Sequence, residues 1–113
     1  MQYDNTRIYT RSLELIDLAR RVMAKLPPGF GFLADQLRRA SSSVVLNFAE
    51  GYGLQTQREQ RRHFTIARGS ASEVAAILDV AAGFGVIDKE QHHHGRDLCD
   101  HIAPMLTNFR RAR

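Results

Sequence analysis

The sequence predicts an all-α protein that folds as one antiparallel four-helix bundle. Apolar residues recur every three or four positions in four segments, and no segment alternates apolar and polar residues long enough to predict a strand. Glycine, proline and capping residues separate the four segments. Connections of about two to eight residues favour antiparallel neighbours, which gives an up-down-up-down arrangement. The 113 residues form a single predicted domain, residues 1–113.

The first two helices are predicted on either side of a Pro-Pro-Gly stop signal at residues 27–29. The first spans about residues 8–26, and the second runs from residues 30–32 to the glycines at 51 and 53. The apolar face of the first is formed by Leu15, Leu18, Ala19, Val22 and Leu26, broadened by Leu13, Ile16 and Met23. That of the second is formed by Leu33, Leu37, Ala40, Val44 and Phe48.

The third and fourth helices each follow a residue suited to cap a helix. Thr56 precedes the third, and Glu59 stands at the capping-box spacing from it. This helix ends at residues 83–85, and its apolar face is Phe64, Ala67, Ala71, Val74, Leu78 and Ala81. Asp88 caps the fourth, whose face is Leu98, Ile102, Met105 and Phe109. Pro104 is expected to kink this helix, because proline removes one backbone hydrogen bond.

Composition is that of an ordinary globular protein, with 43% hydrophobic and 25% charged residues. The first seven residues are polar and lack the apolar core of a signal peptide. The most apolar stretch, residues 74–87, contains Asp79 and two glycines, so we expect no membrane span. Cys99 is the only cysteine, which excludes an internal disulfide and favours a cytoplasmic location.

Basic residues concentrate in the middle of the chain. Residues 38–68 contain six arginines against Glu50 and Glu59, whereas the whole chain has a net charge of +4. Arginine pairs well with phosphate, so this segment is a candidate surface for RNA or DNA of weak sequence specificity. The candidate nucleic-acid-binding residues are Arg38, Arg39, Arg58, Arg61, Arg62 and Arg68. The alternative is a solvated helix face in a chain that a GC-rich genome has enriched in arginine.

Polar residues also interrupt the apolar pattern of the second and third helices. They are Asn47, Glu50, Gly69, Ser70 and Glu73. We interpret them as a structural hydrogen-bonded layer between the two helices, in which Gly69 and Ser70 permit close approach. An acid/base site built from Asn47, Glu50, Ser70 and Glu73 is the alternative.

The histidines do not form a convincing metal site. Residues 92–94 are three successive histidines, which point about 100° apart on a helix and cannot hold one ion. His93, Asp97 and His101 share a face where neighbours could bind zinc or nickel, but a solvated face or a subunit contact explains them as well. Glu90 and His93 match half of a di-iron motif whose other half is missing, which excludes a ferritin-like oxidase.

No nucleophile has the pattern of a catalytic residue. Cys99 has no clear activating partner, and no phosphate-binding glycine loop precedes the serines at 41–43. We therefore expect no enzyme activity, no cofactor and no metal.

A second apolar stripe predicts self-association. Ile66, Ser70 and Ile77 lie about 100° around the third helix from its core face, and Cys99 and Leu106 widen the face of the fourth. A bundle helix needs only one buried stripe, so the second indicates burial against another subunit. The alternative is a broad core face within one chain.

The central third of the chain resembles a known family. The pattern is Ala40-x-x-Ser43-x-x-x-Asn47-x-x-Glu50-Gly51, then Phe64, then Ala67-x-Gly69-Ser70-x-x-Glu73. It is similar to the four helix bundle proteins encoded in 23S rRNA intervening sequences, which have retroelement accessory variability proteins as distant relatives. The resemblance implies a four-helix bundle that assembles into a ring-like homopentamer. In the retroelement branch it also implies a basic surface that binds nucleic acid and a reverse transcriptase, and it carries over no catalytic residues.

Together these features predict a non-enzymatic, oligomeric bundle that binds nucleic acid weakly through arginine-rich helix faces. The expected partners are further copies of the chain, RNA or DNA, and a protein. The modest net charge and near-neutral terminal thirds set this chain apart from the most basic relatives and favour weak binding. The alternative function is a purely structural or protein-binding oligomer without nucleic-acid contact.

Overall fold

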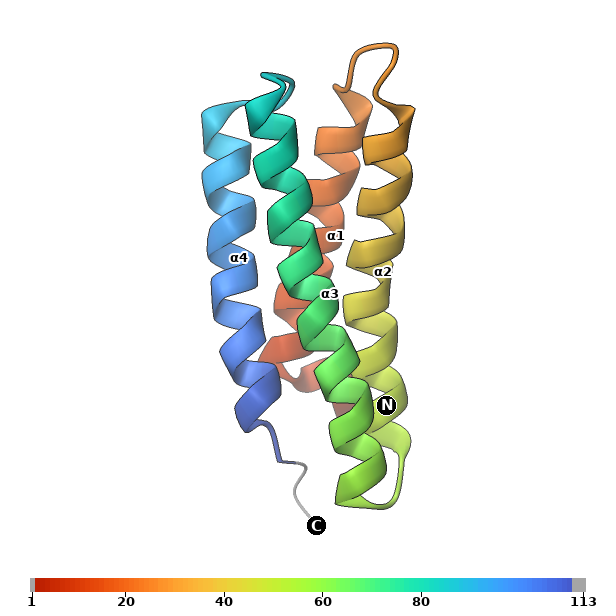
Figure 1. Cartoon of the computed structure of the whole chain (residues 1–113). Coiled ribbons are helices and arrows are strands. Elements are labelled where there is room, and N and C mark those ends of the chain that lie inside the picture. Colours follow the sequence, from red (N-terminus) through yellow and green to blue (C-terminus); the bar gives the residue numbers. More distant parts are fainter. Residues whose placement is uncertain (1, 111–113) are drawn as a thin grey trace.

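The computed structural model describes residues 2–110, apart from the side chains of Asp4 and Asn5, and shows an elongated bundle of 48 × 22 × 21 Å (Figure 1). A short 3-10 helix, η1 (Gln2–Asn5), precedes the helices α1 (Arg7–Ala24), α2 (Gly31–Gly53), α3 (Gln57–Gly83) and α4 (Lys89–Asn108). Each helix packs antiparallel to its neighbours in sequence, and α4 returns to lie beside α1. The predicted all-α four-helix bundle is therefore confirmed, and residues 2–110 contain no strand.

Side-chain caps fix where the helices begin. The predicted caps are confirmed: Thr56 accepts a hydrogen bond from the backbone N–H of Glu59 at 3.2 Å, and Asp88 accepts one from that of Gln91 at 2.7 Å. Thr6 caps α1 in the same way, which the sequence pattern did not reveal. α1 ends at Ala24, two residues before the predicted boundary, and α4 continues through the exposed Pro104.

The core follows the predicted apolar faces. Every predicted face residue of α2 and α3 is buried, as are Leu98 and Ile102 of α4. Aromatic rings fill the end of the core nearest the start of α3, where Phe48 and Phe64 stack at 5.6 Å and Phe109 meets both edge-on. This aromatic packing holds the carboxyl end of α4 against the first turns of α3.

The second apolar stripe is part of the same core, which corrects our interpretation of it as a subunit contact. Ser70, Ile77, Cys99 and Leu106 are all buried within the single chain. Ser70 contacts Ser43 of α2, and Cys99 lies against Ala75 of α3, so a broad core face explains the stripe. Only Ile66 of this stripe stays exposed, at 41%.

The prediction of close packing at Gly69 is wrong. A Cβ atom built there meets no atom within 4 Å, because Gly69 lies on the solvent side of α3. The close approaches occur at two other glycines. A Cβ on Gly51 would lie 2.7 Å from Cε1 of Phe64, and one on Gly95 would overlap the side chains of Leu18 and Leu78.

Candidate nucleic-acid interface

The two candidate arginines of α2 are engaged by carboxylates. Arg38 contacts Asp35 on the preceding turn at 3.1 Å, and Arg39 reaches across to Glu73 of α3 at 3.1 Å. Both pairs are exposed, so they contribute little to stability. They nevertheless neutralise the two guanidinium groups locally, and a phosphate would have to compete with the carboxylates.

Arg61 is a structural clamp on the end of α4. Its Nη1 donates to the carbonyl oxygens of Leu106 at 2.6 Å and Thr107 at 3.0 Å, and its Nη2 donates to that of Phe109 at 2.6 Å. The last carbonyls of a helix lack intrahelical partners, so these bonds supply what the carboxyl end of α4 needs. The guanidinium also lies 5.1 Å from the ring centre of Phe64.

The environment of Arg61 differs from that of a free surface arginine. Burial lowers the pKa of Arg61, and the nearby positive charge of Arg110 lowers it further. The placement of Arg61 on one open face with its neighbours is therefore corrected: its side chain turns towards α4.

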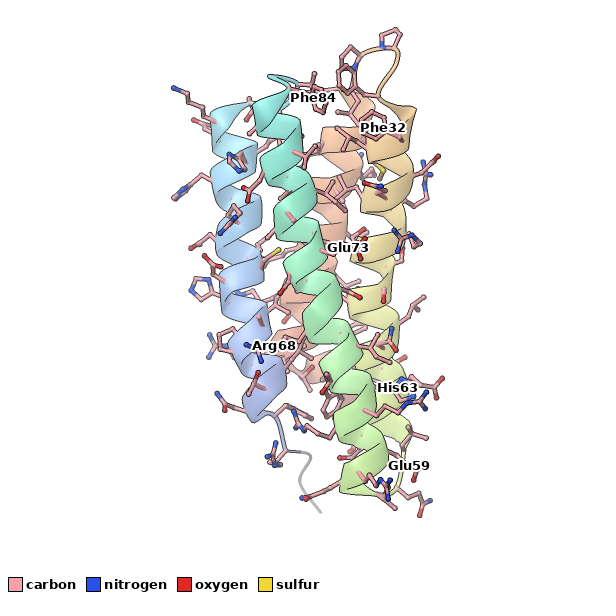
Figure 2. All side chains as sticks on the ribbon, viewed as in Figure 1. Phe32, Glu59, His63, Arg68, Glu73 and Phe84 are labelled. Atoms are coloured by element: carbon pink, nitrogen blue, oxygen red, sulfur yellow. The ribbon has the colours of Figure 1, made fainter. Side chains whose placement is uncertain are left out.

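The remaining candidates, Arg58, Arg62 and Arg68, are exposed and form no ion pair with any described carboxylate. Figure 2 shows Arg68 on the α4 side of α3, with His63 and Glu73 on the α2 side. Several arginines of α1 and α4 are paired, in the contacts Arg11–Glu14, Arg20–Asp17, Arg21–Asp17 and Arg96–Asp79. The first half of α3 thus carries three exposed arginines without a described carboxylate partner.

A pocket of about 280 Å³ opens where α3 begins. It is lined by Gln57, Arg58, Gln60, Arg61 and Arg110. Three of these five side chains are arginines, and none is acidic. The sequence pattern did not reveal this pocket, because Arg110 comes from the far end of the chain and the aromatic packing brings it to α3.

The predicted polar layer is divided by the structure. Ser70 donates from its Oγ to the Oγ of Ser43 at 2.7 Å, and Nδ2 of Asn47 donates to the same Ser43 oxygen at 3.0 Å. Oδ1 of Asn47 lies 3.0 Å from Nδ1 of His63, which donates when that nitrogen carries the proton. The structure thus joins Asn47 and Ser70 through Ser43 in one chain of hydrogen bonds between α2 and α3.

The other members of the predicted polar layer take no part in this chain of hydrogen bonds. Glu50 is exposed, Gly69 faces solvent, and Glu73 contacts Arg39. No carboxylate whose side chain the structure describes enters this chain of hydrogen bonds, so the geometry fits a contact between helices better than acid/base chemistry. His63 was missed because nothing local marks a histidine that will face an asparagine on another helix.

Other reactive groups are held in place or unreactive. Asp79 of α3 binds His92 at 2.7 Å and also Arg96, which ties α3 to α4. Burial, together with the charge of Asp100, raises the pKa of the Cys99 thiol to about 12, so it stays protonated at neutral pH. Within the described residues, no three histidine, cysteine or acidic side chains are grouped as a metal site.

Comparison with known families gives one match over nearly the whole chain. Residues 4–108 match the family model described as 23S rRNA-intervening sequence protein. Among curated proteins, none matches the chain significantly. In the part of the chain that the structure describes, no helix is both long and apolar enough to cross a membrane.

Proposed function

The chain belongs to the 23S rRNA-intervening sequence protein family, and on this premise we propose that it is a non-catalytic, self-associating bundle that binds nucleic-acid backbones weakly. The observation that carries the proposal is the set of unpaired, exposed arginines on the first half of α3, namely Arg58, Arg62 and Arg68. A guanidinium without a carboxylate partner is free to neutralise a phosphate and release its counterion.

The spacing of these arginines suits a phosphate backbone. Arg58 and Arg62 are one helical turn apart, and the rise along the helix axis from Arg58 to Arg68 is about 15 Å. That length is enough for several phosphates of one strand. The exposed rings of Phe32 and Phe84 lie at the opposite end of the bundle (Figure 2), so neither exposed phenylalanine among the described residues offers bases a stacking platform beside the arginines. Binding of this kind is weakly specific for sequence.

Self-association is proposed through the α2–α3 face. We define this face by its exposed large apolar side chains, which are Phe32, Leu46, Ile66, Val80 and Phe84. Leu46 is 65% exposed, and among the exposed large apolar residues that the structure describes only Leu13 lies elsewhere. On α3, Ile66, Val80 and Phe84 fall within about 40° of arc, at about 100° per residue. Exposure of such an apolar stripe to water is unfavourable, which favours its burial against another copy of the chain.

The family resemblance gives five as the proposed number of subunits. A ring repeats the arginines of α3 in every copy, so contacts that are weak singly add up through avidity. Arg68 lies on the α4 side of α3 (Figure 2), so self-association through the α2–α3 face leaves it open. Arg62 falls in the same arc as Ile66, Val80 and Phe84 at about 100° per residue, so it borders the proposed interface.

The test is a salt titration with mixed-sequence RNA and DNA. Binding should weaken steeply between about 50 and 200 mM salt, since each neutralised phosphate releases a counterion. Replacing Arg58, Arg62 and Arg68 by glutamine should flatten the dependence of log affinity on log salt. The matched control replaces Arg11, Arg20 and Arg21 by glutamine, which removes the same charge from arginines that already have carboxylate partners. Absence of binding at low salt, or equal slopes for both triple variants, would refute the proposal.

The second candidate is a protein-binding or structural oligomer without nucleic-acid contact. The observation in its favour is that Arg38, Arg39 and Arg61, half of the predicted basic set, bind groups of the protein itself. This function predicts a stable oligomer whose strand binding is absent or independent of the α3 arginines.

A further inference from the structure

The pocket at the start of α3 has the construction of an anion site, and we propose that it binds a phosphate monoester, in its dianionic form. The proposal deepens the proposed function, on which it rests, by naming the chemical group that the most basic part of the surface holds. The pocket is formed by Arg58, Arg61 and Arg110 together with two glutamines, and its volume is about 280 Å³.

Two of the three guanidinium groups are held by the carboxyl end of α4. The three bonds from Arg61 to main-chain oxygens use three of its five N–H donors, which leaves two for a ligand. Nη1 of Arg110 donates to the carbonyl oxygen of Phe109 at 2.8 Å, the same oxygen that Arg61 contacts. Because Arg61 is already held by three bonds, its contact with a bound anion costs little further side-chain entropy.

The pocket brings positive charges together without a neutralising negative charge from its lining side chains. The charge of Arg110 contributes to the lowered pKa of Arg61, which shows that the two cations interact. No acidic side chain among the described residues lines the pocket. An anion between the guanidinium groups replaces this repulsion by attraction, and charge-assisted hydrogen bonds to guanidinium are among the strong ones.

The backbone of α3 contributes to the same place. Thr56 accepts the backbone N–H groups of Glu59 and Gln60, through its side chain and its carbonyl respectively. The backbone N–H groups of Gln57 and Arg58, the first two residues of this 27-residue helix, have no acceptor within the helix. They add the positive end of the helix dipole to the arginine cluster.

Three cations favour a phosphate monoester over a diester. A monoester carries about −1.5 to −2 charges at pH 7 and presents three terminal oxygens, whereas a diester within a strand carries one charge. Two sources present this group: the phosphorylated end of a nucleic-acid strand and a small free phosphate compound. Both are recognised by the same chemistry, and the experiment separates them.

The experiment has two readouts on the full chain. The first is ³¹P line broadening of inorganic phosphate, which should occur with the unaltered protein and disappear in the double variant Arg58→Gln/Arg110→Gln. The second is the affinity for a 3′-labelled RNA 12-mer with a 5′-phosphate or a 5′-hydroxyl group. One additional charge-assisted contact predicts about tenfold tighter binding of the phosphorylated strand, and the double variant should abolish this preference.

The matched control is Arg62→Gln/Arg68→Gln, which removes the same charge outside the pocket. It should weaken both strands alike and preserve the preference for the 5′-phosphate. Circular dichroism verifies that each variant remains folded, and Arg61 is left unaltered because it holds α4.

The outcomes separate this proposal from the proposed function. Phosphate binding that the pocket variant removes supports the site, and it points to strand ends if the end preference is present and to a small phosphate compound if it is not. Absence of both phosphate binding and end preference overturns the site even when strands bind with a steep salt dependence. A preference for the 5′-phosphate that survives the pocket variant overturns it as well.

Discussion

Arginine has three roles in this protein, and the groups within reach of each side chain decide which. Arg39 pairs with a carboxylate across two helices, Arg61 binds main-chain carbonyls, and Arg62 has no described anionic partner. A partner one turn away, such as Asp35 for Arg38, is visible in the sequence. A partner on another helix is not, because it depends on how far the two helices slide along each other.

The effect of replacing a glycine also depends on the groups that surround it. Gly69→Ala should raise the free energy of unfolding by about 1 kcal/mol, since alanine has the higher helix propensity and its Cβ enters open space. Gly51→Ala should lower it by about 1–3 kcal/mol, because the new methyl group overlaps the buried ring of Phe64. Urea denaturation followed by circular dichroism measures both.

The two glycine substitutions serve as controls for each other, because the chemical change is identical. A destabilising effect at Gly69 would mean that another subunit packs against the solvent side of α3. A stabilising effect at Gly51 would mean that Phe64 moves aside without cost, contrary to its tight packing in the aromatic end of the core.

At the scale of elements, the α3–α4 contact depends on pH. His92 binds one oxygen of Asp79 and Arg96 binds the other, so one carboxylate joins two turns of α4 to α3. The hydrogen bond from His92, and to a smaller extent the charges of Arg96 and His92, lower the pKa of Asp79 in the folded protein. A lowered folded-state pKa gives stability that is present above the unfolded pKa and lost as pH falls through the folded one.

Asp79→Asn should therefore lower the melting temperature at pH 6. It should lose this effect at a pH low enough to protonate the carboxyl group of the unaltered protein in both states, which lies below the usual aspartate range because the folded-state pKa is lowered. The loss at pH 6 should be on the order of 0.5 kcal/mol or less, since the pair is exposed to solvent. Thermal melts at the two pH values measure the difference. Repeating the pH 6 melt at 1 M salt should reduce it, because salt screens exposed charges; a difference that persists at low pH would contradict this account.

Element boundaries were predictable because their signals are local. Thr56 and Asp88 cap the helices that follow them, and the Pro-Pro-Gly turn ends α1 within two residues of the expected place. The buried helix faces were predictable for the same reason, because the spacing of apolar residues along each segment is enough to assign them. Other features depend on which distant segments pack together, and no local pattern encodes that packing. They include the surroundings of Gly69, the position of Arg110 beside the pocket and the partner of His63.

For the whole molecule, charge is distributed unevenly along the bundle. The half that contains the start of α3 (residues 2–14, 46–69 and 102–110) carries seven arginines and four acidic residues. The other half (residues 15–45 and 70–101) carries seven basic and eight acidic residues. An extended anion is thus drawn to the end of the bundle where the unpaired arginines and the pocket lie. Self-association through the α2–α3 face would place several such ends in one assembly.

The α2–α3 face makes that assembly testable. Leu46 and Ile66 lie at the same level of the bundle, between the Asn47–His63 and Ser43–Ser70 contacts. Replacing both by glutamate introduces two charges per subunit into the proposed interface without reaching the core. Light scattering after size exclusion should report about five subunits for the unaltered protein and a monomer for the double variant, with helicity unchanged.

The matched control is a glutamate at Leu13, which is 44% exposed on α1, away from the α2–α3 face. This variant should keep the subunit number. Dissociation should also weaken strand binding at low salt, because a monomer presents one set of arginines and loses the avidity of repeated sites. If the Leu13 variant dissociates and the Leu46/Ile66 variant does not, the interface lies on α1. A monomeric mass for the unaltered protein at micromolar concentration would remove the ring and its avidity together, leaving any nucleic-acid contact to the arginines of a single α3 helix.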